Sequence, residues 1–263
     1  MMGISSSQNT KLKRLKKLKS KKYRDRFGEY LLEGFKSIEL ALTEQSTIDG
    51  IYLEKTQFDR GRLSFLDQID FPEDNIFIVE DELLQPLYET ESPQGVLAVA
   101  KKPSTDFDFL WDDSLKQILF LDRVQDPGNL GTIIRTAEAA GYDLVVCGMG
   151  CADLFNPKTI RSTMGSVVTM KVACEAKGDD VLPFLKGNGF YVISAALNNS
   201  VDYRSMERKQ PHVLILGNEG SGIREEILEQ SDKNVKIPMH GKVESLNVSI
   251  AAGILLYHFG EIS

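Results

Sequence analysis

The sequence lacks the features that mark membrane, secreted and metal-binding proteins. No apolar run reaches the roughly 18 residues of a membrane span, and no charged-then-apolar leader precedes a small-residue cleavage site. The three cysteines, Cys147, Cys151 and Cys174, have neither paired spacing nor neighbouring histidines, which predicts reduced structural thiols and no metal site. We therefore expect a cytoplasmic protein that works without a membrane or a metal.

Positive charge is concentrated at the amino terminus, although the whole chain of 263 residues carries a net charge of −7. Residues 1–26 contain ten Lys or Arg and one acidic residue. Leu12, Leu15 and Leu18 are spaced as on one face of a helix, which predicts a docked apolar edge and a cationic face that suits a polyphosphate. Two other interpretations are a solvated helix face without a partner and a mitochondrial leader, although leaders are richer in Arg.

Apolar runs that alternate with helical patterns divide the chain into two α/β domains. We expect a basic arm and a small α/β domain over residues 1–102, a linker over 103–117, and a larger domain over 118–263. The strands expected in the larger domain are mostly apolar, which is typical of a parallel sheet covered on both faces. Their segments are QILFLDRV, DLVVCG, FYVISAAL, HVLILG and NVKIPM.

The first expected strand of the larger domain runs into the sequence DPGN and then into a helix. Pro127 and Gly128 suit a type II turn, and Asn129 suits the cap of the helix. Ligands of open α/β sheets bind at this carboxyl edge of the strands. Arg135 lies off the expected core face and leans over Gly131, which predicts a cation accessible to a substrate. Spacing alone equally allows an exposed Arg in a helix that tolerates Gly.

Two later segments, LILGNEGSGI (214–223) and KIPMHGKVESLNVSIAAGILLYHF (236–259), also follow expected strands and should meet the same sheet edge. The first lacks both the Lys-Ser/Thr ending of a phosphate loop and the spacing of a dinucleotide fingerprint. In the second, Ser245 suits the cap of a helix that is apolar around much of its surface, so we expect this helix to be buried, within the domain or between subunits. Asn247 then needs a polar partner.

These three segments, in this order, closely resemble the motifs of the SpoU/TrmH family of RNA ribose 2′-O-methyltransferases, within the SPOUT superfamily. TESPQGVLAVA (90–100) also resembles the end of the ribosomal-protein-like substrate-binding domain of many members. The resemblance covers nearly the whole chain. It implies a carboxyl-terminal α/β domain with a deep trefoil knot, a homodimer packed through helices beside the knot, and an amino-terminal domain that binds RNA.

The resemblance also implies an activity: methyl transfer from S-adenosylmethionine to a ribose 2′-hydroxyl, for which we expect large-subunit ribosomal RNA as the substrate. Arg135 occupies the catalytic position of the family, and Asn129, Glu219, Ser245 and Asn247 occupy the positions of its polar supports. Cofactor contacts, largely from backbone, map to Leu197, Leu216, Gly217, Asn218, Ile237, Pro238, Met239, Ser245 and Leu246.

A free-base Arg is costly near neutral pH, so we expect Arg135 to hold a phosphate and stabilise the developing alkoxide, with Glu219 orienting its guanidinium. A neighbouring phosphate or water would take the proton. The alternatives are transfer RNA as substrate, a catalytically silent RNA-binding protein, and a nicotinamide-dependent oxidoreductase, which only the parallel sheet suggests.

Overall fold

The computed structural model describes residues 1–66, 69, 71–105, 110 and 112–260, and its contacts divide the chain into two compact units. The first unit contains Met1–Pro103 together with Phe155–Thr169. The second contains Ser104–Leu154 and Met170–Ser263. The sequence did not indicate that residues 155–169, between two strands of the second unit, pack with the first. Tyr30 and Phe155, whose ring centroids lie 4.9 Å apart, are one such contact.

The first unit is built on a mixed five-stranded sheet with the order β1-β4-β3-β5-β2. β1, β4 and β3 are parallel to one another, whereas β5 pairs antiparallel with both β3 and β2. The strands are β1 (Met2–Ile4), β2 (Glu29–Glu33), β3 (Ile48–Glu54), β4 (Ile76–Val79) and β5 (Val96–Lys101). The helices are α1 (Thr10–Leu18), α2 (Lys21–Phe27), α3 (Phe35–Thr43), α4 (Lys55–Asp59), α5 (Asp81–Leu84), α7 (Pro157–Thr163) and α8 (Ser166–Thr169), with the 3-10 helices η1 (Arg62–Leu66), η2 (Glu73–Asn75) and η3 (Gln85–Leu87).

The basic arm folds as part of this unit, as the leucine spacing predicted. Asn9 caps α1 by accepting a hydrogen bond from the Lys11 backbone N–H (2.9 Å). Leu12, Leu15 and Leu18 are buried in a core with residues of β2, β3, β4 and β5, while the lysines of α1 remain exposed. Burying three leucines stabilises the unit by several kcal/mol, at roughly 1.5–3 kcal/mol each. α1 is therefore an integral element that presents a cationic face.

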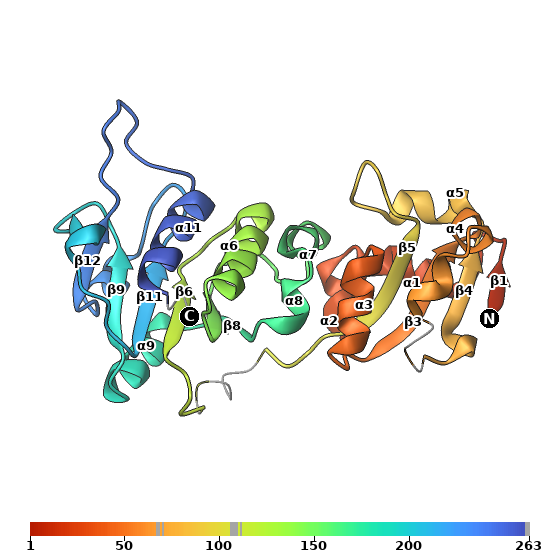
Figure 1. Cartoon of the computed structure of the whole chain (residues 1–263), viewed down its shortest axis with the longest axis horizontal. Coiled ribbons are helices and arrows are strands. Elements are labelled where there is room, and N and C mark those ends of the chain that lie inside the picture. Colours follow the sequence, from red (N-terminus) through yellow and green to blue (C-terminus); the bar gives the residue numbers. More distant parts are fainter. Residues whose placement is uncertain (67–68, 70, 106–109, 111, 261–263) are drawn as a thin grey trace. The chain divides into compact units, whose positions relative to one another are not determined.

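The second unit is a seven-stranded sheet whose pairs are all parallel, with the order β10-β12-β9-β11-β6-β7-β8 (Figure 1). Each expected strand is present, and β8 and β10 are two further strands. The bounds are β6 (Gln117–Leu121), β7 (Leu144–Gly148), β8 (Val172–Ala176), β9 (Tyr191–Ala195), β10 (Val201–Asp202), β11 (His212–Leu216) and β12 (Lys233–Lys236). The 3-10 helix η5 (Tyr203–Ser205) follows β10. β6 thus begins at Gln117, inside the expected linker.

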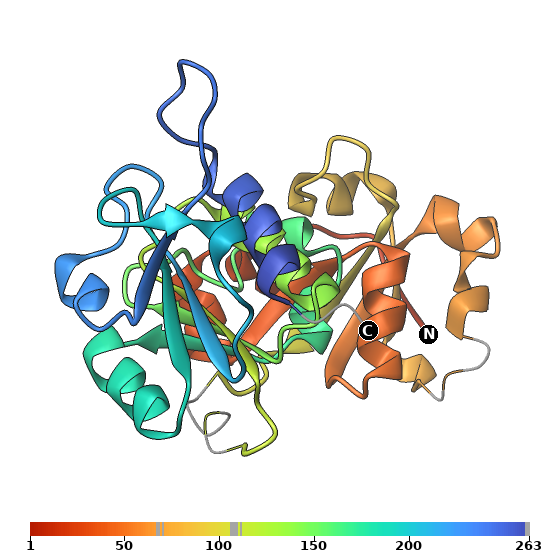
Figure 2. The ribbon, with the colours of Figure 1, turned by 60° about the vertical axis from the view of Figure 1, so that its left-hand side comes forward.

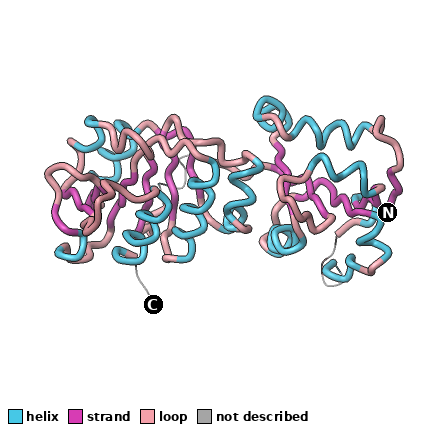
Figure 3. The backbone as a smooth tube through the Cα atoms, turned by 90° about the horizontal axis from the view of Figure 1, so that it is seen from above, coloured by secondary structure: helices cyan, strands magenta, loops and turns pink. Residues whose placement is uncertain are grey.

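Helices cover both faces of this sheet, as its apolar strands predicted (Figure 3). On one face, α9 (Gly178–Gly187) and α10 (Glu225–Leu228) pack on a core that includes Phe120, Val146 and Ile215. On the other, α6 (Pro127–Ala139) and α11 (Val248–Phe259) lie side by side (Figures 1 and 2). None of the described helices is long and apolar enough to cross a membrane.

The strand order determines which loops meet. β12, β9, β11 and β6 are neighbours in the sheet although the chain forms them far apart in sequence. After β9 and the short β10, the chain returns to the middle of the sheet for β11 and then goes outside β9 again for β12, an order consistent with the knot that the resemblance implies. The carboxyl ends of these four parallel strands form one edge.

Candidate functional site

The three motif segments meet at this carboxyl edge, as predicted. The residues after β6 lie beside those after β11, because β6 and β11 pair in parallel from Gln117–His212 to Leu121–Leu216. The loops after β9 and β12 continue the same edge. The loop between β12 and α11, shown in blue in Figure 1, extends beyond the strands. Side chains from four chain segments are thereby brought within reach of one another.

The helix after β6 begins earlier than predicted. α6 starts at Pro127 and is capped by Asp126, whose carboxylate accepts a hydrogen bond from the Asn129 backbone N–H (2.8 Å). Pro127 and Gly128 are therefore the first residues of the helix and not the centre of a type II turn, and Asn129 is not the cap. Pro at this position loses no hydrogen bond, because the first N–H groups of a helix have no partner within it. The side chain of Asn129 is left free for other contacts.

Asn129, Glu219 and Asn247, one residue from each motif, form a chain of side-chain hydrogen bonds. Asn129 Nδ2 donates to Glu219 Oε1 (3.1 Å), and Asn247 Nδ2 donates to Asn129 Oδ1 (3.1 Å). Asn247 is also the cap of α11, through an Oδ1 that accepts from the Ser249 N–H (2.9 Å). The predicted cap, Ser245, lies two residues outside the helix and is exposed. The polar partner expected for Asn247 is thus Asn129.

Glu219 is held as a carboxylate at the beginning of α6. Partial burial raises its pKa, but bonds from its own backbone, from Asn129 and from the N–H groups of Asp126 and Gln125 outweigh burial and hold the pKa below its usual value. A negative charge here is also favoured by the positive end of the helix dipole. Glu219 is therefore an ionised acceptor at neutral pH.

Arg135 is exposed on α6 and does not pair with Glu219, contrary to the prediction. Among the described residues, no ion pair or hydrogen bond is recorded for its guanidinium. Six residues separate Arg135 from Asn129, which places it about 9 Å further along the helix axis. Gly131 lies on the buried face of α6, so it does not open a path to a substrate. Arg135 is accordingly a cation available to a partner outside the chain.

The loop after β11 is closed on itself by Asn218. Its backbone pairs in both directions with Gly222 (3.0 Å each), and its Oδ1 accepts from the N–H groups of Gly220 and Ser221 (2.9 Å each). Gly217 lies so close to this turn that an added Cβ would come within 2.3 Å of the Gly222 carbonyl carbon. A glycine is required at this position because the two backbone segments approach closely, which holds the loop as a tight turn at the sheet edge.

A buried carboxylate that the sequence interpretation missed anchors the same loop. Asp122, at the end of β6, is fully buried. It accepts hydrogen bonds from the backbone N–H and the Nε of Arg224 (2.9 Å each), and Arg123 lies 3.3 Å from it. Removing one partner of a buried pair leaves a costly unpaired charge. The available signal was an acidic residue directly after the apolar run QILFL.

Comparisons with known proteins show the family of the chain. Residues 116–257 match the SpoU rRNA Methylase family, and residues 9–98 match the MRM3-like substrate binding domain. The chain belongs to the SpoU rRNA methylase family. It is 36% identical, over 98% of its length and 99% of the relative's, to the 23S rRNA (guanosine(2553)-2′-O)-methyltransferase RlmP of Bacillus subtilis.

Solved structures of the family share this fold over nearly the whole chain. The AdoMet-bound rRNA methyltransferase from Sinorhizobium meliloti is 29% identical, with a TM-score of 0.85 over 97% of this chain and 96% of that one. The SpoU methyltransferase AviRb from Streptomyces viridochromogenes, in complex with AdoMet, is 26% identical, with a TM-score of 0.81 over 95% and 97% of the two chains.

The residues that the resemblance assigns to the cofactor lie at the end of β11 and in the loops after β9, β11 and β12. Leu197 and Ser245 are exposed, Leu216 is buried, and Gly217, Asn218, Ile237, Pro238, Met239 and Leu246 are half-buried. Within the described residues, no three His, Cys, Asp or Glu side chains come together in a way that could hold a metal ion.

Proposed function

We propose that this protein transfers a methyl group from S-adenosylmethionine to a ribose 2′-hydroxyl of large-subunit ribosomal RNA. The observation that carries the proposal is the hydrogen-bonded chain Asn129–Glu219–Asn247, which assembles the three SpoU motifs at one sheet edge. The near full-length similarity to a 23S rRNA 2′-O-methyltransferase supports this RNA as the substrate. A catalytically silent RNA-binding protein would have no need of this assembled edge.

The turn that contains Gly217 suits the cofactor. The absence of a side chain at Gly217 lets the loop turn tightly on Gly222, and the neighbouring half-buried residues offer backbone N–H and C=O groups that suit an adenosine and its amino-acid tail. Bound S-adenosylmethionine supplies an electrophilic methyl carbon on a sulfonium. The contacts assigned to Leu197, Leu216–Asn218, Ile237–Met239, Ser245 and Leu246 are part of this proposal.

Arg135 then acts on the RNA. Its guanidinium stays protonated at neutral pH, so it is a poor general base. It instead binds the phosphate next to the target ribose and stabilises the negative charge that develops on the 2′-oxygen. The proton passes to a phosphate or to water. Asn129, Glu219 and Asn247 hold the first turn of α6, and therefore the helix that carries Arg135, against the cofactor loops.

Calorimetric titration separates this function from the two other classes. We expect saturable binding of S-adenosylmethionine to the full-length protein and no binding of NAD, because the glycine-rich loop lacks dinucleotide spacing. An oxidoreductase would bind NAD instead, and a silent RNA-binding protein would bind neither ligand.

The dimer expected from the resemblance is part of the proposal. Ile250 and Tyr257, which are 56% and 46% exposed, lie with the half-buried Ile254 on one stripe of α11. A symmetric partner would cover this apolar stripe. We expect a dimer by light scattering, and the double substitution Ile250→Glu with Tyr257→Glu should convert it to a folded monomer. A wild-type monomer at micromolar concentration would contradict this assignment.

The cationic face of α1 should bind phosphates without reading bases. Lys13 and Lys16 of α1 and the nearby Lys22 of α2 are exposed, so replacing all three with Gln leaves the buried leucines in place. Each lost phosphate contact should flatten the slope of log affinity against log salt by roughly 0.7 to 0.9, or by about 2 to 3 in total. Deleting residues 1–22 would be a poorer test, because it removes Leu12, Leu15 and Leu18 from the core.

The matched control replaces Lys116 and Lys233 with Gln. Both are exposed at the amino ends of β6 and β12, on the opposite edge of the second sheet. An equal change of slope in this control, or no change of slope in the triple variant of Lys13, Lys16 and Lys22, would show that α1 is only a solvated helix face.

A further inference from the structure

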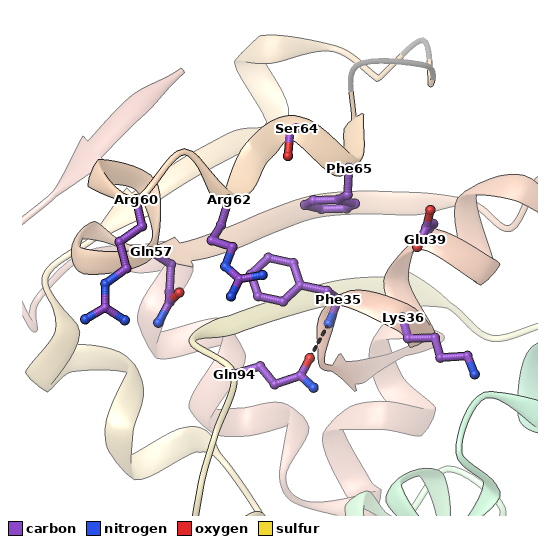
Figure 4. A pocket seen from close by; sticks show the side chains of 9 residues that line it. All are labelled: Phe35, Lys36, Glu39, Gln57, Arg60, Arg62, Ser64, Phe65 and Gln94. Carbon is purple, nitrogen blue, oxygen red and sulfur yellow. Dashed lines mark hydrogen bonds between the residues drawn. The ribbon is translucent and has the colours of Figure 1, made fainter.

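The first unit contains an open pocket of about 680 Å³ beside the beginning of α3 (Figure 4). Three segments line it: the first turns of α3, the stretch from α4 through η1, and the loop before β5. All of its lining residues fall inside the part of the chain that matches the MRM3-like substrate binding domain. Neither the site at the second sheet nor the cationic face of α1 accounts for it.

Two aromatic rings form the apolar part of the pocket. The centroids of Phe35 and Phe65 lie 5.4 Å apart with the rings nearly perpendicular, and both side chains are only half-buried. The Arg62 guanidinium lies 6.0 Å from the centre of the Phe35 ring, toward which its side chain extends in Figure 4. Rings and guanidinium planes that remain partly exposed are the surfaces on which unpaired nucleobases stack.

The polar lining suits the rest of a nucleotide. Lys36, Arg60 and Arg62 bring three positive charges against the single carboxylate of Glu39, so the pocket favours an anion such as a phosphate. Gln94 Oε1 accepts the Phe35 N–H (2.9 Å), which fixes this side chain and leaves its NH2 group to donate to a carbonyl on a base edge. The pocket thus combines surfaces for base stacking, positive charge and a hydrogen-bond donor.

We infer that this pocket is a subsite for one unpaired nucleobase of the RNA substrate and its adjoining phosphate. The inference rests on the proposed function and names the part of the RNA that the first unit selects. Bases inside an A-form helix are stacked and paired, so only a base from a loop, bulge or single strand can enter. The subsite would therefore favour RNA substrates that present such a base, while α1 contacts RNA phosphates whatever the base sequence.

The test compares two RNA probes with the full-length protein at one fixed salt concentration. Fluorescence anisotropy would measure the affinity for a labelled single-stranded oligoribonucleotide and for the blunt duplex of the same sequence. We expect the double variant Phe35→Leu with Phe65→Leu to bind the single strand roughly 5- to 100-fold more weakly, as expected for lost base stacking. Arg62→Ala should weaken it by a smaller factor. Duplex binding should stay nearly unchanged.

Phe58→Leu is the matched control. Phe58 is 37% exposed on α4 and does not line the pocket. Melting curves would accompany each variant, and if the double variant were unfolded, the exposed Arg62→Ala variant would decide. Unchanged single-strand affinity in the folded pocket variants, or an equal loss for the duplex or for Phe58→Leu, would overturn the subsite. Titration of S-adenosylmethionine on the same proteins tests the proposed function separately, since failure there leaves the RNA comparison intact.

Discussion

Replacing Arg135 with Ala should lower the rate of methyl transfer by about a hundredfold or more while leaving folding and cofactor affinity nearly unchanged. The guanidinium is exposed and makes no ion pair with the described residues, so its loss costs the fold little. A group that stabilises charge only in the transition state affects turnover and not ground-state binding. Single-turnover transfer of a labelled methyl group, a melting curve and cofactor titration would measure the three quantities.

Arg208→Ala is the control for a general loss of positive charge. Arg208 is also exposed, but it precedes β11 and so lies toward the amino ends of the strands. Its substitution should leave turnover within a few-fold of the wild type. If Arg135→Ala instead lowered the melting temperature strongly and spared the single-turnover rate, Arg135 would be a structural residue.

The second large effect is expected at Gly217. Gly217→Ala would force a Cβ to within 2.3 to 2.6 Å of the Gly222 and Ile223 backbone, so the loop after β11 must shift. Overpacking costs about 1–3 kcal/mol, which corresponds to roughly 5- to 150-fold weaker cofactor binding if the cost falls on the conformation of the turn that binds the cofactor. Calorimetric titration with S-adenosylmethionine would measure the change.

Gly220→Ala is a matched control in the same loop. A Cβ on Gly220 would meet its nearest neighbour, Asn218 Oδ1, at 3.7 Å, which is an ordinary contact. We expect cofactor affinity within about twofold of the wild type there, as for most surface substitutions. Equal losses of cofactor affinity at both positions would mean that any added side chain in this loop weakens binding. The close backbone approach at Gly217 would then not explain the effect.

Long apolar segments allowed most of the fold to be predicted. QILFL, LVVCG and HVLIL are fully buried strands, and their continuous apolar character indicated a parallel sheet with two covered faces. β1, β8 and β10 were missed because β1 and β10 have only three and two residues and β8 contains the exposed Glu175. The packing of residues 155–169 against the first unit depends on long-range contacts, which leave no local pattern in the sequence.

Helix starts and ion pairs were the weak points of the site prediction. Asp126 and Asn129 can both cap α6, as Ser245 and Asn247 can both cap α11, because each has a short side chain with an acceptor oxygen. The structure uses Asp126 and Asn247, which leaves the Asn129 side chain to join Glu219. Opposite charges predicted a bond between Arg135 and Glu219. However, Glu219, in the loop after β11, contacts the first turn of α6, whereas Arg135 lies two turns further along that helix.

The central claim is that the assembled carboxyl edge of the second sheet methylates a ribose of large-subunit ribosomal RNA. The most direct measurement incubates the purified full-length protein with labelled S-adenosylmethionine and unmodified large-subunit RNA, followed by alkaline hydrolysis and mapping of the label. We predict label in an alkali-resistant dinucleotide at one position, since a 2′-O-methyl group blocks cleavage there, and none with Arg135→Ala. Label on a base, or no transfer by a protein that binds S-adenosylmethionine and this RNA, would contradict the claim.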